Sequence, residues 1–479
     1  MLDYSKIFVK ENNNDALEER HLVLYTMVDS TPTILNSENA KVKSCLTNEI
    51  LKTLDFKNNS FIEKEQFIFA LISSDASLNM KHRIWLGMAK IYDKLIDKNI
   101  SVVIDGEYTE ECVYGLVIKS YSYDFIKKDP KNNDKKQLKL KFTNSYKSKA
   151  LEIANIQNFA RFLGDTPANL MTPLIMSEYI KSLFSSEKID LKILDKKMIE
   201  AEQMNLILSV SQGSSQEPVF IHAKYFGRDS CDIDLALVGK GVTFDTGGIS
   251  LKPAEAMYKL KQDMMGAAIC ASLMKIVSSL NLKINLSITL PLVENMPGSS
   301  ATKPGDVFIS KCGKSVEVDN TDAEGRLILA DAITFAQKDN PEFLFDIATL
   351  TGSVRIALGN VYGGYFTGNE DLSSLIELCS TETGDLLWRL PLSPFIAQEL
   401  SSDVADLSNA AKINKGAAGA SYAAEFIKEF VDPHVKWAHF DVSGIRNNHH
   451  FKELFGDQTT ARPIPTFFAL IEKLERKFK

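Results

Sequence analysis

The chain has 479 residues, of which 44% are hydrophobic, and a formal net charge of −7. This length favours two domains with sizeable cores, and the acidic balance argues against nucleic acid as an obligatory partner. The six cysteines are scattered without a Cys-x-x-Cys pair, which predicts neither a disulfide framework nor a zinc ribbon. The N-terminus lacks the apolar core of a signal peptide. The sequence contains no stretch of about twenty apolar residues, the length needed to span a membrane. We therefore expect a cytoplasmic protein.

The first 150 residues have the pattern of a separate, smaller α/β domain. Apolar stretches predict strands, and one stretch with helical periodicity predicts a helix. The expected strands are Leu22–Met27, Gln66–Ile72 and Ser101–Asp105, and the expected helix is Met80–Ile96.

A lysine-rich stretch ends this first domain. Residues 127–149 carry nine lysines against two aspartates, together with Pro130 and several asparagines. This composition is typical of an exposed boundary, and we favour a solvated linker over a patch for an anionic partner. Ala150–Leu163 then has helical periodicity and begins the second domain, expected at residues 151–479.

A first group of charged residues follows a buried-looking strand. Ile233–Val238 is largely apolar, as strands buried in a parallel sheet are. It runs into a glycine-rich segment that carries Lys240, Asp245 and Lys252. A helix is predicted at Met264–Leu280, directly after Asp263, which places this acid near the helix N-terminus.

A second group lies further along the chain. Asp322, Glu324 and Arg326 stand within five residues of one another. A short strand is predicted before them at Val316–Val318, and a helix is predicted at Glu324–Gln337. Strand ends and helix starts are where open α/β sheets place their functional sites.

Together the two groups supply four carboxylates, two lysines and one arginine, with no histidine. Such oxygen-rich sets suit hard or borderline divalent cations, and carboxylates that bridge two ions are what a two-metal hydrolase needs. Each residue alone has an ordinary alternative: Asp263 could be a helix cap and Arg326 a salt-bridge partner. The joint pattern predicts a metal-dependent hydrolase, and the absence of His-Glu-x-x-His argues against a zincin.

Asn320–Leu327 is similar to the signature of the leucyl aminopeptidase family, the dinuclear-zinc cytosol aminopeptidases, and Val238–Pro253 resembles the family's first metal-binding segment. Five more stretches resemble the family: Asp165–Pro173, Glu294–Pro297, Lys303–Asp306, Ala348–Gly352 and Trp437–His439. The resemblance covers residues 150 to 479. It implies a larger catalytic domain with a central mixed sheet flanked by helices.

The resemblance implies two divalent ions per subunit. Asp245 and Glu324 would bridge the ions, Lys240 and Asp263 would complete one site, and Asp322 would complete the other. Zinc is the family's metal, and Mn, Mg or Co would also suit the exchangeable site.

The resemblance also assigns catalytic and substrate-binding roles. A charged Lys252 would stabilise the oxyanion formed from the peptide carbonyl. Arg326 would hold a bicarbonate ion that acts as general base, because its planar fork suits a planar oxyanion. The residues expected to contact substrate are Lys240, Asp245, Ser250, Lys252, Leu260 and Asp263.

Two positions depart from the family pattern. Leu260 stands where methionine commonly lines the pocket for the first side chain, a volume-conserving change. Arg446 stands where relatives tend to carry an uncharged residue; it points either to solvent or into the pocket, and the second case puts a leucine preference in doubt.

A third metal site, formed by backbone carbonyls, would lie near Leu163, Gly164 and Thr166.

The function implied is release of N-terminal, preferentially apolar, leucine-type residues from peptides with a free N-terminus. The family also implies a homohexamer. No membrane partner is expected, because the sequence has no long apolar stretch. Two alternatives remain. One is a non-catalytic or moonlighting assembly protein of the same fold, which the intact metal and catalytic positions argue against. The other is a dipeptidase of narrow specificity, of the cysteinylglycine type.

Overall fold

The computed structural model describes residues 1–3, 7–9, 18–28, 31–35, 61–64, 67–72, 79–96, 100–104, 108–126, 140–141, 149–185, 188–411, 416–447 and 450–478. They form two compact units. The N-terminal unit comprises residues 2–159 and 449–458, and the larger unit comprises Met1, residues 160–448 and residues 459–479. The division falls within helix α5 (Lys149–Asp165), and the predicted boundary at residue 150 lies at the start of this helix.

The N-terminal unit contains a mixed sheet and helices. Its strand order is β3-β4-β1-β5-β6, with β2 paired to β1. The strands are β1 (Glu18–Val28), β2 (Thr31–Ile34), β3 (Phe61–Lys64), β4 (Phe67–Leu71), β5 (Ile100–Val103) and β6 (Leu140–Lys141). The helices are α3 (Met80–Ile96), α4 (Thr109–Ser120) and α16 (Lys452–Phe455), and α16 packs against both others.

Most elements predicted for this unit are present, and α3 has the predicted bounds. Helix α4 was not predicted, because its continuous apolar run does not distinguish a buried strand from a buried helix. The predicted linker at 127–149 lies almost entirely outside the described residues, which include only 140–141 and 149 of it.

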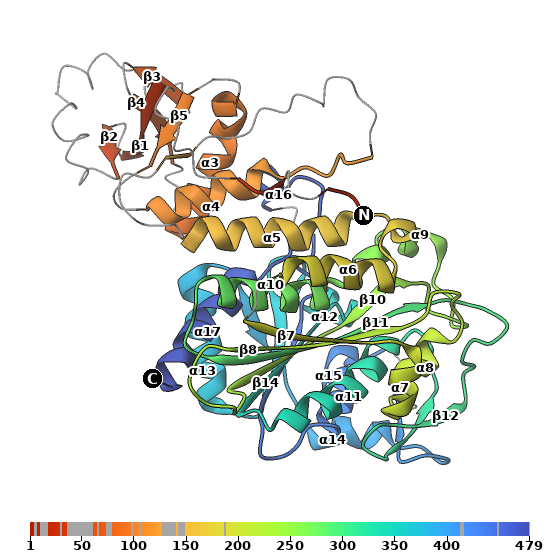
Figure 1. Cartoon of the computed structure of the whole chain (residues 1–479). Helices are drawn as coiled ribbons and strands as arrows, with labels where there is room; N and C mark the ends of the chain where they lie inside the picture. Colours follow the sequence, from red (N-terminus) through yellow and green to blue (C-terminus); the bar gives the residue numbers. More distant parts are fainter. Residues whose placement is uncertain are drawn as a thin grey trace. The chain divides into compact units, whose positions relative to one another are not determined.

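The larger unit is built on a nine-stranded mixed sheet of order β16-β15-β18-β14-β9-β11-β8-β7, with β10 paired to β11 (Figure 1). The strands are β7 (Ile189–Leu194), β8 (Val219–Phe226), β9 (Leu235–Gly239), β10 (Gly241–Asp245), β11 (Asn285–Asn295), β14 (Phe343–Ala348), β15 (Gly363–Phe366), β16 (Leu387–Arg389) and β18 (Lys436–Asp441). The neighbours β18, β14, β9 and β11 are parallel.

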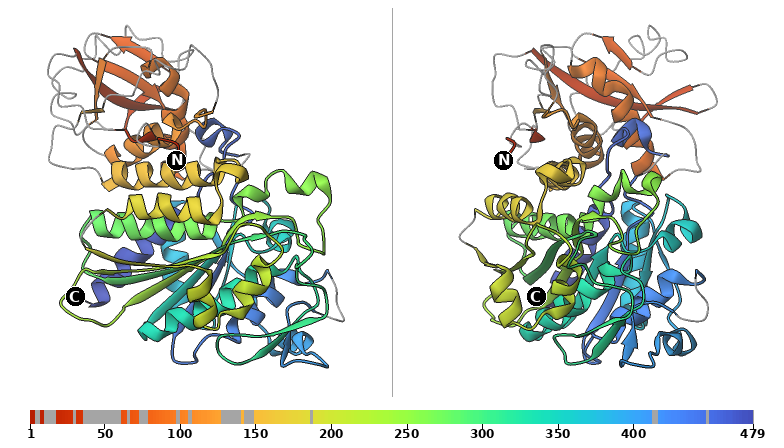
Figure 2. Two further views of the ribbon diagram at one scale, coloured as in Figure 1. Left: turned by 45° about the vertical axis from the view of Figure 1, so that its right-hand side comes forward. Right: turned by 90° about the vertical axis from the view of Figure 1, so that its right-hand side faces the viewer.

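Helices cover both faces of this sheet, as Figures 1 and 2 show. On one face α10 packs on β9, β11 and β14, and α17 packs against α10 and α13; on the other, α11 and α8 pack on β11. These helices are α8 (Asn205–Ser211), α10 (Met265–Ser279), α11 (Glu324–Ala336), α13 (Glu370–Thr383) and α17 (Ile464–Phe478). Because both faces are covered, the parallel strands β9, β11, β14 and β18 are buried almost throughout. The predicted α/β fold with a central mixed sheet flanked by helices is confirmed.

Shorter elements complete the unit. Its other helices are η3 (Ala168–Leu170), α6 (Pro173–Leu183), α7 (Lys196–Ala201), α9 (Ala254–Met257), η4 (Leu260–Gln262), η5 (Gln337–Asp339), α12 (Gly352–Leu358), α14 (Pro394–Ala397), η6 (Gln398–Leu400) and α15 (Gly419–Lys428). A small sheet joins β12 (Asp306–Ile309), β13 (Ser315–Val318) and β17 (Leu407–Ser408). Within the described ranges, no helix has both the length and the apolarity that crossing a membrane requires.

The chain between β9 and β10 is bent at Lys240. Both strands pair with β11, β9 over Leu286–Thr289 and β10 over Leu292–Asn295. At the break, the Lys240 N–H donates to the Ile347 carbonyl at 3.0 Å. The sequence predicted only a glycine-rich segment here, whereas the structure shows a second strand. Lys240 and Asp245 thus lie at the carboxyl ends of successive strands.

Candidate metal centre

The predicted acids converge at the carboxyl edge of the sheet. Asp245 ends β10, Glu324 begins α11, and Asp322 lies just before that helix. Within the described part of the chain, ligand oxygens of these three carboxylates all lie within 4.8 Å of one another. Asp263 lies outside this group of three, between η4 and α10, and connects to it through a lysine.

That lysine is Lys240, which is enclosed by acceptors. Its Nζ lies 2.7 Å from Asp263 Oδ2 and 2.9 Å from Glu324 Oε1. Nζ also donates a hydrogen bond to the Thr349 carbonyl at 3.0 Å. The Lys240 and Glu324 side chains are each 2% exposed, so this half of the site is closed to bulk water.

The second lysine, Lys252, lies at a more open position. Its Nζ is 2.8 Å from Asp245 Oδ2 and forms an ion pair with Asp322 Oδ1. The side chains of Lys252 and Asp322 are 16% and 31% exposed. This half of the site therefore faces the solvent side.

The carboxylates carry more negative charge than the two lysines neutralise. Burial, together with the charges of Glu324 and Asp245, raises the pKa of Asp322 to about 6, although the Lys252 ammonium acts in the opposite direction. Burial also raises the pKa of Asp263 to about 7, although the Lys240 ammonium acts in the opposite direction. A bound divalent cation would relieve this crowding of negative charge.

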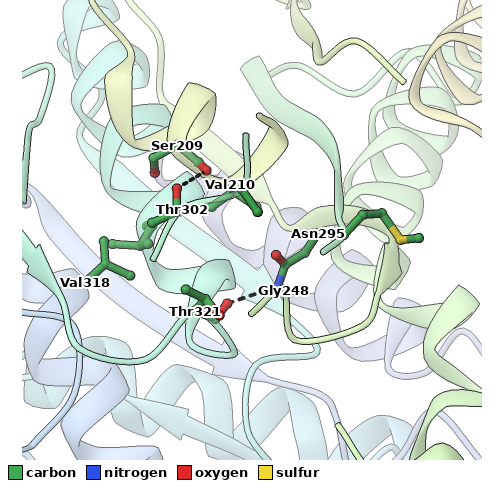
Figure 3. Close-up of a pocket in the computed structure, with 10 residues that line it drawn as sticks. Ser209, Val210, Gly248, Asn295, Thr302, Val318 and Thr321 are labelled. Carbon is green, nitrogen blue, oxygen red and sulfur yellow. Dashed lines mark hydrogen bonds between the residues drawn. The ribbon is translucent and has the colours of Figure 1, made fainter. Parts of the chain in front are cut away.

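Asn295, at the end of β11, links the two predicted metal-binding segments. Its Nδ2 donates to Asp245 Oδ1 at 2.9 Å and to the Thr321 carbonyl at 3.0 Å. Figure 3 shows the second of these bonds beside a cavity of about 10 Å³ that Gly248 also lines, room for about one water. Sequence reasoning noted the segment containing Asn295 but gave the residue no role, because the bond joins positions far apart in the chain.

Arg326 lies on the first turn of α11 and is anchored by one nitrogen. Its Nη1 donates to the Asn409 carbonyl at 2.7 Å. Its buried Nε has no hydrogen-bond partner among the residues described. Burial lowers the pKa of Arg326 to about 10, while the charges of Glu324, Asp441 and Asp322 act in the opposite direction. The guanidinium therefore keeps a donor available for an anion.

A pocket of about 450 Å³ opens beside the acids. Ser250, Asp322 and Arg326 line it together with Tyr422 and a set of glycine, alanine and serine residues. The Ser250 N–H donates to Thr321 Oγ1 at 2.8 Å, which ties the Ser250 loop to the segment before Asp322. The pocket brings a space for substrate next to three predicted site residues.

Leu260 and Arg446 lie near Asp263 and are not among the residues that line this pocket. Leu260 is partly buried in η4. Burial lowers the pKa of Arg446, and the charges of Asp263, Asp441 and Asp245 oppose this effect. The Asn447 Nδ2 donates to Gln262 Oε1 at 3.1 Å, which holds the segment after Arg446 against η4. The Arg446 side chain is partly buried and within electrostatic range of the carboxylates.

The backbone carbonyls predicted to bind a third metal ion, those of Leu163, Gly164 and Thr166, lie at the C-terminal end of α5. Leu163 and Thr166 are fully buried, and the Thr166 hydroxyl donates to the Phe162 carbonyl at 2.7 Å. The Lys261 ammonium donates to the carbonyl of Asp165, the residue between Gly164 and Thr166. The positively charged Lys261 side chain thus lies at this end of α5. The third metal site stays a prediction.

The donors at the main centre fit divalent metal ions. The ligands are charged oxygens, which such cations prefer. The buried Glu324 Oε2 accepts no hydrogen bond from any residue that the structure describes, although its other oxygen is paired with Lys240. An unsatisfied buried carboxylate oxygen needs an explanation, and a metal ligand position provides one. Fold and centre together define an α/β metallohydrolase.

Comparison with known proteins identifies the family. Residues 158–468 match the profile described as cytosol aminopeptidase family, catalytic domain. The chain is 46% identical over 379 residues to the cytosol aminopeptidase of Encephalitozoon cuniculi, covering 79% of this chain and 77% of the relative. It is 42% identical over 366 residues to that of Homo sapiens, covering 76% and 69%. The chain belongs to the cytosol aminopeptidase family and is a metal-dependent aminopeptidase.

Solved structures show the same fold. A point mutant of tomato leucine aminopeptidase superimposes with a TM-score of 0.78 at 26% identity, covering 97% of this chain and 96% of that one. The bottromycin maturation enzyme BotP superimposes with a TM-score of 0.81 at 23% identity, covering 96% and 99%. The second likeness supports the fold alone.

Proposed function

We propose that this enzyme releases N-terminal residues, preferentially of the leucine type, from peptides by hydrolysis with two divalent metal ions. The observation that carries the proposal is the group Asp245, Asp322 and Glu324, whose ligand oxygens lie within 4.8 Å of one another beside a substrate-sized pocket. Three carboxylates this close are costly unless cations bind between them.

Asp245 and Glu324 are the residues proposed to be shared by both ions. Lys240 and Asp263 would complete one site, and Asp322 the other. Lys240 can serve only as a neutral amine, so it must release a proton when the metal binds. Bound divalent ions supply a Lewis acid for the peptide carbonyl and lower the pKa of water. Zinc, manganese, magnesium and cobalt all suit such ligands, and BotP has been solved in complex with Mn.

Lys252 and Arg326 are the proposed catalytic residues. Lys252 remains an ammonium group and lies where it can stabilise the negative charge that develops on the carbonyl oxygen. Arg326 lines the pocket, and its buried Nε has no hydrogen-bond partner among the described residues. Its planar guanidinium suits a planar oxyanion such as bicarbonate. Bicarbonate held there would supply the general base that the protein's own motifs lack.

The substrate is a peptide with a free N-terminus. Its first residue would contact Lys240, Asp245, Ser250, Lys252, Leu260 and Asp263. A pocket-facing Arg446 put the leucine preference in doubt, but its aliphatic stem can pack against an apolar side chain while its charged end discriminates against basic ones, so we propose that the preference is kept. Consistent with the names of the relatives, we propose a cytoplasmic location, and on the family resemblance a homohexamer.

Metal removal is the experiment that tests the proposal. Dialysis against a chelator should abolish hydrolysis of leucine amide, and added Zn, Mn or Co should restore it. Full activity in a rigorously metal-free sample would exclude a metal mechanism.

A substrate panel tests the specificity. Leucine and methionine amides should be hydrolysed faster than arginine amide, and Arg446→Met should narrow that difference. Activity confined to cysteinylglycine would instead favour the dipeptidase alternative.

A further inference from the structure

Thr349 contacts Lys240 and Asp263 in the enclosed half of the metal centre. It directly follows β14 and is buried. Its carbonyl accepts a hydrogen bond from Lys240 Nζ at 3.0 Å, and its hydroxyl donates to Asp263 Oδ1 at 2.8 Å. We propose that Thr349 is a positioning residue that orients Lys240 and Asp263 toward one of the two ions. The inference rests on the proposed two-metal function.

The carbonyl of Thr349 fixes the direction of the lysine amine. Nζ has three acceptors around it: Asp263 Oδ2, Glu324 Oε1 and the Thr349 carbonyl. A neutral lysine keeps two N–H bonds and gains one lone pair. The carbonyl can accept only an N–H, so it holds one of the two protons and leaves the lone pair directed to the carboxylate side, where a cation would be.

The hydroxyl of Thr349 fixes the rotation of the carboxylate. It engages Asp263 Oδ1, which turns Oδ2 toward Lys240 at 2.7 Å. Groups that hydrogen-bond to metal ligands orient them, and their loss typically weakens metal binding about 10–100-fold. One residue therefore orients two ligands with two different groups.

Asp441 holds the Thr349 segment in place from the neighbouring strand. β14 and β18 pair so that Ala348 lies opposite Asp441. The Asp441 carboxylate accepts from the Leu350 N–H at 3.2 Å, the Thr351 N–H at 3.0 Å and the Thr351 hydroxyl at 2.7 Å. These bonds fix the backbone directly after Thr349, so its carbonyl and hydroxyl keep their directions.

The test compares Thr349→Val, which removes only the hydroxyl bond, with Thr349→Ser, which retains it. Thr289→Val is the matched control, because Thr289 is also buried in the sheet but its hydroxyl contacts His222 instead. The affinities of both zinc or manganese ions are measured by competition with a chelator, and metal-free thermal unfolding checks the fold.

We expect Thr349→Val to weaken the binding of one of the two ions about 10–100-fold and to leave the affinity for the other ion unchanged. Thr349→Ser and Thr289→Val should keep both affinities. The inference is overturned if Thr349→Val binds both ions with wild-type affinity, or if its affinities for the two ions fall equally. A wild-type protein that binds fewer than two ions would instead overturn the proposed two-metal function, and this inference with it.

Discussion

Lys240 and Lys252 are two lysines in one centre with opposite surroundings. Lys240 is 2% exposed, with two carboxylates and a backbone carbonyl around its Nζ. Lys252 is 16% exposed, and its Nζ pairs with the carboxylates of Asp245 and Asp322, the second of which lines the pocket. The difference shows that two residues of one type can have different surroundings in one centre, and it is the basis of the roles proposed for them: metal ligand for the enclosed lysine and oxyanion stabiliser for the open one.

Electrostatics alone would not distinguish the two lysines. Burial lowers the pKa of each, and the surrounding carboxylates more than reverse this, so that both end above the usual lysine value. Only a cation close to Lys240 would favour its neutral form. The roles proposed for the two lysines therefore rest on geometry.

Lys240→Met should have the largest effect, because it removes a proposed metal ligand and, in the metal-free enzyme, leaves Asp263 and Glu324 without their buried counter-charge. We expect loss of one metal ion per subunit and of nearly all activity. Metal analysis of the purified variant decides the first point. If Lys240→Met kept both ions, Lys240 would not be a ligand.

Arg326→Ala should retain both metal ions and lower kcat about 10²–10⁴-fold, the usual contribution of general-base assistance. KM should change little, since the loss concerns the transition state. Steady-state kinetics with and without added bicarbonate provide the measurement. A rate response to bicarbonate that survives in this variant would contradict the role given to Arg326.

Lys252→Met is the direct counterpart of Lys240→Met. It should keep both ions and lower kcat about 10²–10³-fold, as expected when one oxyanion donor is removed. Bound metal per subunit and steady-state kinetics are measured side by side for Lys240→Met and Lys252→Met. The results compare the proposed ligand role of Lys240 with the proposed oxyanion-stabilising role of Lys252. Loss of metal from Lys252→Met would make the two lysines equivalent and break the comparison.

Gly325→Ala should have the smallest effect and should act on Lys240 alone. A methyl group at this position would lie 2.6 Å from Lys240 Cε and 2.7 Å from its Nζ, so the lysine must shift. We expect roughly tenfold weaker binding of one ion, although alanine in a helix usually stabilises it by about 1 kcal/mol over glycine. Unchanged affinity for both ions would show that Lys240 has room to adjust.

The sequence predicts the ligands better than it predicts what holds them. Asp322 and Glu324 are close in the chain and stand at a helix start, so their proximity is readable from the sequence. The contacts of Asn295 and Thr349 depend on which strands are neighbours, and the order β18-β14-β9-β11 is not written in the chain. Backbone acceptors such as the Thr349 carbonyl carry no side-chain signature at all.

The fold shows the same limit. The α10 and α11 helices were predicted nearly to their ends, because long periodic segments are distinctive. Strand β10 was missed, because five residues between glycines resemble a loop. Its pairing with β11 places Asp245 in the centre, and that pairing is set by tertiary contacts.

We propose that the aminopeptidase works with two metal ions, and a metal titration of the metal-free enzyme tests this most directly. Bound metal per subunit and the rate of leucine amide hydrolysis are measured in the same samples. We predict that activity rises to its maximum as two ions bind per subunit. Maximal activity with one ion bound, or with none, would contradict the account.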